Sequence, residues 1–336
     1  RDALAARLKA LYAIEVSTTP RVHGGRLFYA KRSGSQNQPV IYVRDAAAKG
    51  ADRVAIDPNG LSASGTVAMD WMYPSPDGSL IAYGMSPGGS EHSTLRVRRV
   101  EAGTDLDESI PDAQFADVAW DPDGKGFLYT RHPAKGEVPA GEEVFHEQMF
   151  HHALGADPQK DPLLFGGEGR PIQENRSVYN SSDHQWTFFA TSLDWAKNDL
   201  SVRRAGTTGA FVPVAQGLDG TTQGDAYKGT LYLRTNVGAE RYRIVSVAPA
   251  TPDAQHWKTV IPEQKGVIDD WAIVGGRIAV VVSLDAVSHL ELFGLDGALQ
   301  REVRLPALGN VQHLAGEPDG KGFLYTRHPA KGEVPA

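Results

Sequence analysis

SPDGSLIAYG, residues 75–84, joins a turn signal directly to a strand signal. Asp77-Gly78 favours a tight turn, because Asp accepts hydrogen bonds from nearby backbone N–H groups and Gly adopts the left-handed conformation. The apolar and aromatic run that follows is typical of a β-strand. The same order is met seven times, at intervals of about 44 to 60 residues, at Gly24-Gly25, Asp77-Gly78, Asp123-Gly124, Asp183-His184, Lys228-Gly229, Gly275-Gly276 and Asp319-Gly320.

Short runs rich in β-branched and aromatic residues fill the chain after Pro20, and each predicts a strand. The clearest are RLFYAKR (26–32), PVIYVRD (39–45), SLIAYGM (79–85), TLRVRRV (94–100), GFLYTRH (126–132), QWTFFAT (185–191), TLYLRTN (230–236), RYRIVSV (241–247) and RIAVVVS (277–283).

The spacing of the turns predicts an all-β fold, a seven-bladed β-propeller, in which each blade takes about 40–50 residues. A four-stranded blade has two apolar faces and buries both only when neighbours stack on it around an axis. Large aromatic rings suit the wedge-shaped space between blades. We expect this role for most of the following residues, with lining of the central tunnel as the alternative for a few: Trp71, Tyr73, Trp120, Tyr129, Tyr179, Trp186, Trp257 and Trp271. Spacing alone leaves one large or two tandem β-sandwiches open.

Composition excludes several classes of function. A net charge of −7 without a dense basic run argues against a nucleic-acid partner. The absence of cysteine excludes disulfides, thiolate zinc sites and a catalytic thiol. The longest apolar run, residues 278–284, is far shorter than the roughly 20 residues that span a bilayer, so we expect a buried strand and no membrane partner.

The two ends of the chain depart from the repeat. Leu4, Leu8 and Leu11 form one apolar stripe, which predicts a short N-terminal helix and linker over residues 1–19 before a propeller domain over 20–336. Residues 317–336 are an anomalous second copy of 121–140, identical letter for letter from the proline onward, and we expect an incomplete seventh blade there. The start at Arg1, without Met or signal peptide, predicts a fragment or a processed form.

Three motifs look chemical and are better interpreted as structure. Gly84-Met85-Ser86-Pro87-Gly88 fits the G-x-S-x-G nucleophile elbow, but proline has no N–H for the oxyanion hole, so we expect a loop. His146 and His151 are five residues apart and not four, which rotates them off a common helical face. We expect His151 and His152 to lie on a strand, one inward and one outward. Asp121–Gly126 is expected to be a turn and not a calcium loop. No catalytic residue, metal site or cofactor is predicted.

Ordered motifs from the N-terminus to about Gly316 resemble those of the prolyl oligopeptidase family. They are Asp57-Pro58-Asn59, Leu61-Ser62, Gly65-Thr66-Val67-Ala68, Ser75-Pro76-Asp77-Gly78, Ala82-Tyr83-Gly84, Gly89-Ser90, Ala119-Trp120, Asp123-Gly124-Lys125-Gly126, His152-Ala153-Leu154-Gly155, Asp161, Trp257-Lys258 and Val260-Ile261-Pro262-Glu263.

The resemblance implies a cytoplasmic or periplasmic serine peptidase in which a seven-bladed propeller caps an α/β-hydrolase domain. The propeller admits short peptides, which are cut after proline. No position in this chain matches the family's Ser, Asp and His triad motifs, so the resemblance implies a gating domain that is inactive alone. The perfect duplication keeps a second function open, a stand-alone or engineered propeller that serves as a binding scaffold.

Two site residues follow from the resemblance. Phe115, in AQFADVAW, matches the phenylalanine that walls the family's proline pocket, with core packing as the other interpretation. The family's peptide-contacting arginine is not matched, because the corresponding loop reads Thr191-Ser192-Leu193-Asp194-Trp195. Trp195 is the residue in that loop that would stack on a peptide.

Overall fold

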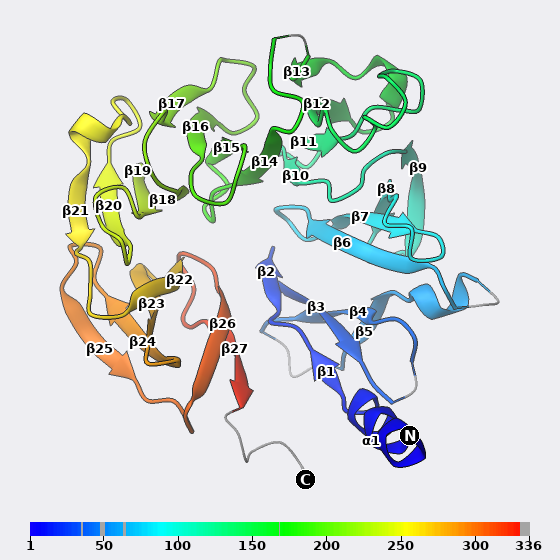
Figure 1. Ribbon diagram of the computed structural model, residues 1–336, viewed down its shortest axis with the longest axis horizontal. Helices are drawn as coiled ribbons and strands as arrows, with labels where there is room; N and C mark the ends of the chain where they lie inside the picture. The colour runs from blue at the N-terminus through cyan, green and yellow to red at the C-terminus, as the bar shows by residue number, and fades with distance from the viewer. Residues whose placement is uncertain (35, 48–50, 63–64, 168, 330–336) are drawn as a thin grey trace. The chain divides into compact units, whose positions relative to one another are not determined.

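Each of the seven turn signals joins two neighbouring strands of an antiparallel sheet in the computed structural model, which confirms all seven turns (Figure 1). The structure describes residues 1–336 except 35, 48–50, 63–64, 168 and 330–336. Asp77 illustrates how local chemistry sets a turn. Its Oδ1 accepts hydrogen bonds from Ser79 N at 3.0 Å and Ser75 Oγ at 2.7 Å, and Gly78 has a φ of 67°.

The chain divides into two units, of which the first is Arg1–Gly166. Its helices are α1 (Asp2–Tyr12) and the 3-10 turns η1 (Pro58–Gly60) and η2 (Pro158–Lys160). The first sheet comprises β1 (Val16–Ser17), β2 (Arg21–His23), β3 (Arg26–Arg32), β4 (Val40–Asp45) and β5 (Arg53–Ile56). The second comprises β6 (Ala68–Pro74), β7 (Leu80–Ser86), β8 (Thr94–Arg99) and β9 (Thr104–Ile110). The third comprises β10 (Val118–Trp120), β11 (Gly126–Arg131), β12 (Gln148–Ala153) and β13 (Leu163–Phe165).

The second unit is Gly167–Ala336. Its first sheet comprises β14 (Asn175–Asn180), β15 (Trp186–Ser192), β16 (Asp199–Arg204) and β17 (Val212–Ala215). The next two comprise β18 (Thr222–Tyr227), β19 (Thr230–Thr235), β20 (Arg243–Val247) and β21 (Lys258–Ile261), and then β22 (Val267–Val274), β23 (Arg277–Leu284), β24 (Val287–Phe293) and β25 (Leu299–Val303). The last comprises β26 (Gly309–Ala315) and β27 (Leu324–Pro329). The 3-10 turn η3 is Ala254–His256.

Nearly every sheet is a simple up-and-down meander, the strand order of a propeller blade. The first sheet departs from the expected four strands, because both β1 and β2 pair with β3. The edge strand is interrupted before Pro20, which has no N–H to give to a ladder. At the interruption Thr18 keeps contact with the sheet, since its N donates to Ala30 O at 2.9 Å and its Oγ1 accepts from Ala30 N at 3.0 Å.

The core consists of separate hydrophobic clusters, each made by two neighbouring sheets within one unit. The expectation for the large aromatic residues is confirmed, because they lie in these clusters or pack against them: Trp71, Tyr73, Trp120, Tyr129, Tyr179, Trp186, Trp257 and Trp271. Residues 278–284 lie in β23 and are buried except at the strand's end, as predicted.

The G-x-S-x-G sequence is not the loop we expected. Its first three residues are the last three of β7, and only Pro87 and Gly88 lie beyond the strand. Gly84 is directly opposite Trp71 on β6, and a Cβ on Gly84 would lie 2.3 Å from the indole Cε2. The glycine is required by the packing of the tryptophan. Ser86 is 1% exposed, and its Oγ donates to Asp70 at 3.0 Å.

The described part of the duplicated segment contributes the second strand of a hairpin in both places, β11 in one copy and β27 in the other. Leu128 of β11 pairs with Ala119, and its counterpart Leu324 of β27 pairs with Ala315. Leu128 is 2% exposed and Leu324 is 37% exposed. β11 also pairs with β12 on its other side, whereas the last sheet has two strands in the described residues.

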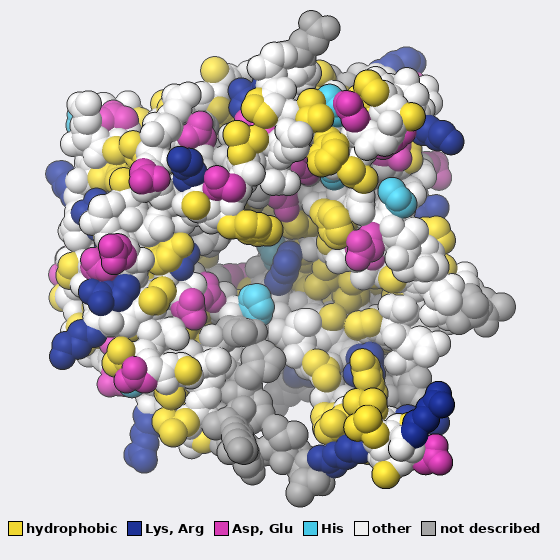
Figure 2. Space-filling view, viewed as in Figure 1, with side chains coloured by type: hydrophobic (Ala, Val, Ile, Leu, Met, Phe, Trp, Pro, Cys, Tyr) yellow, Lys and Arg dark blue, Asp and Glu magenta, His cyan; other side chains and the backbone are white. Residues whose placement is uncertain are grey.

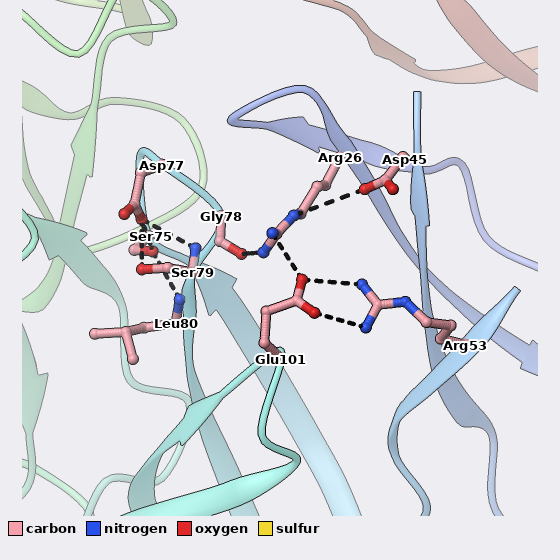
Figure 3. Close-up of polar contacts among 9 residues, drawn as sticks. All are labelled: Arg26, Asp45, Arg53, Ser75, Asp77, Gly78, Ser79, Leu80 and Glu101. Carbon is pink, nitrogen blue, oxygen red and sulfur yellow. Dashed lines mark hydrogen bonds and ion pairs between the residues drawn. The ribbon is translucent and has the colours of Figure 1, made fainter. Parts of the chain in front are cut away.

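An ion-pair group joins the first sheet to the second (Figure 3). Arg26 of β3 donates from Nη1 to Gly78 O at 2.8 Å and pairs through Nη2 with Glu101 at 2.7 Å. Arg53 of β5 binds the same carboxylate with both terminal nitrogens, each at 3.1 Å. Hydrogen bonds from Arg53, and the positive charges of both arginines, hold the pKa of Glu101 below its ordinary value.

We expect Glu101→Gln to lower the melting temperature by about 1–2 °C at low salt, since exposed ion pairs contribute little. A group with a lowered pKa stabilises the fold fully above its ordinary pKa, so the difference from wild type should begin to shrink as the pH falls below about 4.5 and should vanish below the lowered pKa of the folded state. It should also shrink in 1 M NaCl. Glu240→Gln, at an exposed glutamate that forms no ion pair within the described residues, is the control for thermal scans. An effect independent of salt would contradict the ion-pair explanation.

Candidate functional site

Phe115 lies in the loop between β9 and β10, residues 111–117, hereafter the Phe115 loop. Its side chain is 63% exposed, although Ala113 and Ala116 beside it are 0% and 1% exposed. Its φ of 53° is in the left-handed region that non-glycine residues seldom adopt. The exposure excludes core packing, and the fold holds a large apolar ring out to solvent.

Hydrogen bonds fix the backbone of the Phe115 loop on both sides of the ring. Trp71 Nε1 donates to Ala113 O at 3.1 Å. His132, at the end of β11, donates its backbone N–H to Asp112 O at 2.9 Å. Because these partners come from both sheets that flank the loop, the position of the ring depends on the contact between the two sheets.

The C-terminal end of the loop is anchored by Asp117. Its backbone N donates to Thr130 Oγ1 at 3.0 Å, and its carboxylate accepts from Tyr73 OH at 2.7 Å. Burial and the neighbouring carboxylate of Asp117 raise the pKa of Tyr73, so the phenol remains a donor at physiological pH. The loop is therefore a rigid mount for Phe115.

His132 contacts this loop through its backbone bond to Asp112, and burial lowers the pKa of its imidazole below the ordinary value of 6.5. Its Nδ1 is buried and has no hydrogen-bond partner among the described residues. A proton on this ring would be poorly solvated, so the neutral imidazole suits the folded loop.

We expect the Phe115 loop to loosen as the pH falls below about 6.5, because a histidine with a lowered pKa opposes protonation in the fold but not in the opened loop. After correction for the intrinsic pH dependence of exchange, the amides of the loop should exchange roughly two- to fivefold faster at pH 5.5 than at neutral pH. His132→Gln should remove this excess. An excess that persists in the variant would assign it to another group.

Trp195 lies in the second unit, in the loop between β15 and β16. Its side chain is 100% exposed, and Leu193 beside it is 59% exposed. Asp194 Oδ1 accepts from Ala196 N at 2.8 Å and so forms the turn that presents the indole. The loop base is fixed to the next sheet, since Asn198 Oδ1 accepts from Thr222 N at 2.7 Å. Phe115 and Trp195 thus belong to different units, each on an anchored loop.

A buried carboxylate in the second unit had no signal in the sequence. Asp225 on β18 is 9% exposed, and its oxygens accept from Ser182 N at 2.7 Å, Ser182 Oγ at 2.6 Å and Ala226 N at 2.7 Å. Burial raises the pKa of Asp225 to about 6. Ala226 is the next residue along the strand, but Ser182 lies in the turn that precedes β15, and only the fold brings its two donors to Asp225.

The adjacent histidines of β12 face opposite sides, as predicted. His152 is fully buried and its Nδ1 lies 3.0 Å from both oxygens of Asp161, which also accepts from Tyr129 OH at 2.9 Å. His151 is partly exposed and its Nε2 lies 2.8 Å from Asp121. Among the described residues, no three His, Cys, Asp or Glu side chains converge as a metal site would require. This cluster has the geometry of a structural clamp between β11, β12 and η2.

Comparisons with known proteins identify the family and the fold. Residues 1–328 match the family model described as prolyl oligopeptidase, N-terminal beta-propeller domain. The prolyl endopeptidase of Elizabethkingia meningoseptica is 29% identical over 329 residues, which cover 97% of this chain and 46% of that protein. The dual function macrocyclase-peptidase of Galerina marginata is 27% identical over 271 residues, 72% of this chain and 36% of that protein. The chain thus spans about half or less of the length of these curated relatives.

Solved structures give the same result. A structure from a study of two prolyl endopeptidases superimposes with a TM-score of 0.89 at 30% identity, covering 97% of this chain and 48% of that one. Prolyl oligopeptidase B from Galerina marginata, at 21% identity and a TM-score of 0.82, supports the fold. No helix in the described part of the chain has the length and hydropathy needed to span a bilayer. The chain is an all-β propeller with one N-terminal helix and belongs to the prolyl oligopeptidase family, whose N-terminal β-propeller domain it matches.

Proposed function

We propose that this chain is the seven-bladed, substrate-gating propeller of a serine endopeptidase that cleaves short peptides after proline in the cytoplasm or periplasm. An α/β-hydrolase domain of the same enzyme supplies the catalytic triad, and residues 1–19 belong to the hydrolase side of the boundary with the propeller at 20–336. The match of residues 1–328 to the family's propeller model is the observation that carries the proposal.

The exposed apolar stripe of the N-terminal helix supports the proposal that a further domain packs against this chain. No residue of α1 is buried, and Leu4, Leu8 and Leu11 are 65%, 47% and 37% exposed. Hydrophobic side chains gather over this helix in Figure 2, at the lower right. An apolar stripe of this kind is stabilised when another surface covers it, and in this proposal that surface is the hydrolase domain.

The Phe115 loop supports a role in substrate contact. A rigidly mounted aromatic ring exposed to solvent is typical of residues that contact a ligand, because ordering it on binding costs little entropy. In this proposal Phe115 walls the pocket for the substrate proline, and Trp195 stacks on the peptide.

We expect Phe115→Ala to raise KM for a proline-containing chromogenic peptide about tenfold and to change kcat less than twofold, as lost apolar contact would do. The enzyme for this test is a chimera in which this chain replaces the propeller of the Elizabethkingia meningoseptica relative. Leu163→Ala, an exposed leucine on the outer strand β13, is the control. A fall in kcat with unchanged KM would contradict a role in ground-state binding.

Gating and activity are tested with the same chimera. It should cut short proline peptides, discriminate against an unfolded protein of the same composition, and lose activity to a serine-directed reagent, whereas the chain alone should cut neither. Turnover by the chain alone would overturn the proposal. Tight binding of peptides by the chain alone, with an inactive chimera, would favour a stand-alone binding scaffold.

A further inference from the structure

A cavity of about 420 Å³ lies in the first unit, beside the outer strand β9 of the second sheet and the residues that follow β12 of the third. Its volume is within the range of about 300–1,000 Å³ that is usual for small-molecule sites. Its lining residues are Leu80, Arg99, Leu106, Asp107, Glu108, Leu154 and Gly155. Three leucines give it apolar walls. Two of its charged residues, Glu108 and Arg99, have opposite charges, and each has side-chain atoms that make no hydrogen bond within the described residues.

Glu108 is an acid buried beside this cavity and is 6% exposed. Its Oε1 accepts from Gly155 N at 2.7 Å, whereas its Oε2 is buried and has no hydrogen-bond partner among the described residues. A buried carboxylate oxygen left unsatisfied costs free energy that a donor in the cavity would recover.

A β-bulge aims Glu108 inward. The pairing of β9 with β8 shifts between Arg96 and Arg98, so residues 106–108 lie opposite Val97 alone. Bulges of this kind re-aim side chains and are frequent beside binding sites. Within the bulge, Leu106 and Glu108 are at least partly buried, and Asp107 between them is exposed at the rim.

Arg99, at the end of β8, provides the opposite charge. Arg99 is exposed, and its guanidinium makes no hydrogen bond or ion pair within the described residues. Although Arg99 and Glu108 line the same cavity, they are not paired with each other. A guanidinium in this state is free to bind a carboxylate.

We propose that this cavity binds a zwitterion with an aliphatic side chain, a free amino acid or a dipeptide. The ligand's ammonium group donates to Glu108 Oε2, its carboxylate pairs with Arg99, and its side chain contacts the leucines. A simple cation would be repelled by Arg99, and a simple anion by Glu108 and by Asp107 at the rim, so a ligand that carries both charges fits best. This site does not depend on the peptidase role proposed above.

The test measures binding of L-leucine and glycyl-leucine to the full chain by calorimetry, together with N-acetyl-leucine and leucine amide, which each lack one charge. The two zwitterions distinguish an amino-acid site from a dipeptide site. At least one of them should bind about tenfold more tightly than both singly charged analogues, since each lost charge removes one charge-assisted contact.

Two variants locate the site. Glu108→Gln keeps an acceptor for Gly155 N and removes the negative charge, and Arg99→Met removes the positive charge while keeping an apolar stem. Each should weaken zwitterion binding about tenfold. Arg96→Met, an exposed arginine on the same strand outside the cavity, should bind like wild type. If Glu108→Gln does not fold, Arg99→Met alone decides.

Equal affinity for the zwitterions and their singly charged analogues would overturn the proposal. So would full affinity in Arg99→Met, or no heat and no thermal shift at 20 mM L-leucine and glycyl-leucine. The last result would leave Glu108 Oε2 to an ordered water molecule.

Discussion

Replacing Gly84 with alanine is expected to lower the free energy of unfolding by about 3 kcal/mol, the upper end of the range for overpacked cores. The new Cβ would lie 2.3 Å from Cε2 and 2.5 Å from Nε1 of Trp71, and the ring has to move. Trp71 cannot move freely, because it packs against the cluster between the second and third sheets and donates to Ala113 O. The substitution should therefore also release the Phe115 loop.

Chemical denaturation measures the first effect, and amide exchange of the loop residues measures the second. Gly60→Ala is the matched control, because a methyl group there would meet no atom within 4 Å and the φ of Gly60 is ordinary. Trp71→Leu combined with Gly84→Ala should cost less than the sum of the single changes, since removing the ring removes the clash. Additive costs would show that the glycine serves the backbone and not the tryptophan.

The middle strands of the sheets were predictable, and most edge strands were not. Every run that stood out in the sequence is a second or third strand, such as 79–85 in β7 and 277–283 in β23. Second strands such as β7 and β23 are buried on both faces and read as continuously apolar runs. A third strand such as β8 alternates buried and more exposed residues, which is the other pattern typical of a strand. An outer strand such as β9, TDLDESI, is mostly exposed and has a polar sequence that resembles a loop.

Of the candidate site, the sequence pointed only to the two exposed aromatic residues. Phe115 and Trp195 followed from resemblance, and the structure supplies the anchoring that a motif cannot carry. Glu108 and Asp225 left no signal, because an isolated acid in a strand is usually solvent-facing. Their burial results from a bulge in one case and from a turn that precedes another strand in the other.

Asp225→Asn is expected to raise the free energy of unfolding by about 2–3 kcal/mol at pH 8. Burial raises the pKa of Asp225 to about 6, so the native state tolerates the neutral acid better than the carboxylate. The amide is a neutral mimic of the same shape. Its oxygen keeps the bonds from Ser182 N and Ala226 N, and its NH₂ group donates to Ser182 Oγ, which turns to accept.

The raised pKa of Asp225 also fixes the pH range in which the variant should be more stable than wild type. A carboxyl group whose pKa is raised by folding costs stability as the pH rises from about 4 to 6, and above that range the cost is constant. Urea denaturation of Asp225→Asn and wild type should therefore converge near pH 4 and separate fully above pH 6. Asp219→Asn, whose side chain is fully exposed, should match wild type throughout. A variant less stable than wild type at pH 8 would mean that the donors around Asp225 hold a carboxylate, because the loss of its charge would then outweigh the relief of burial.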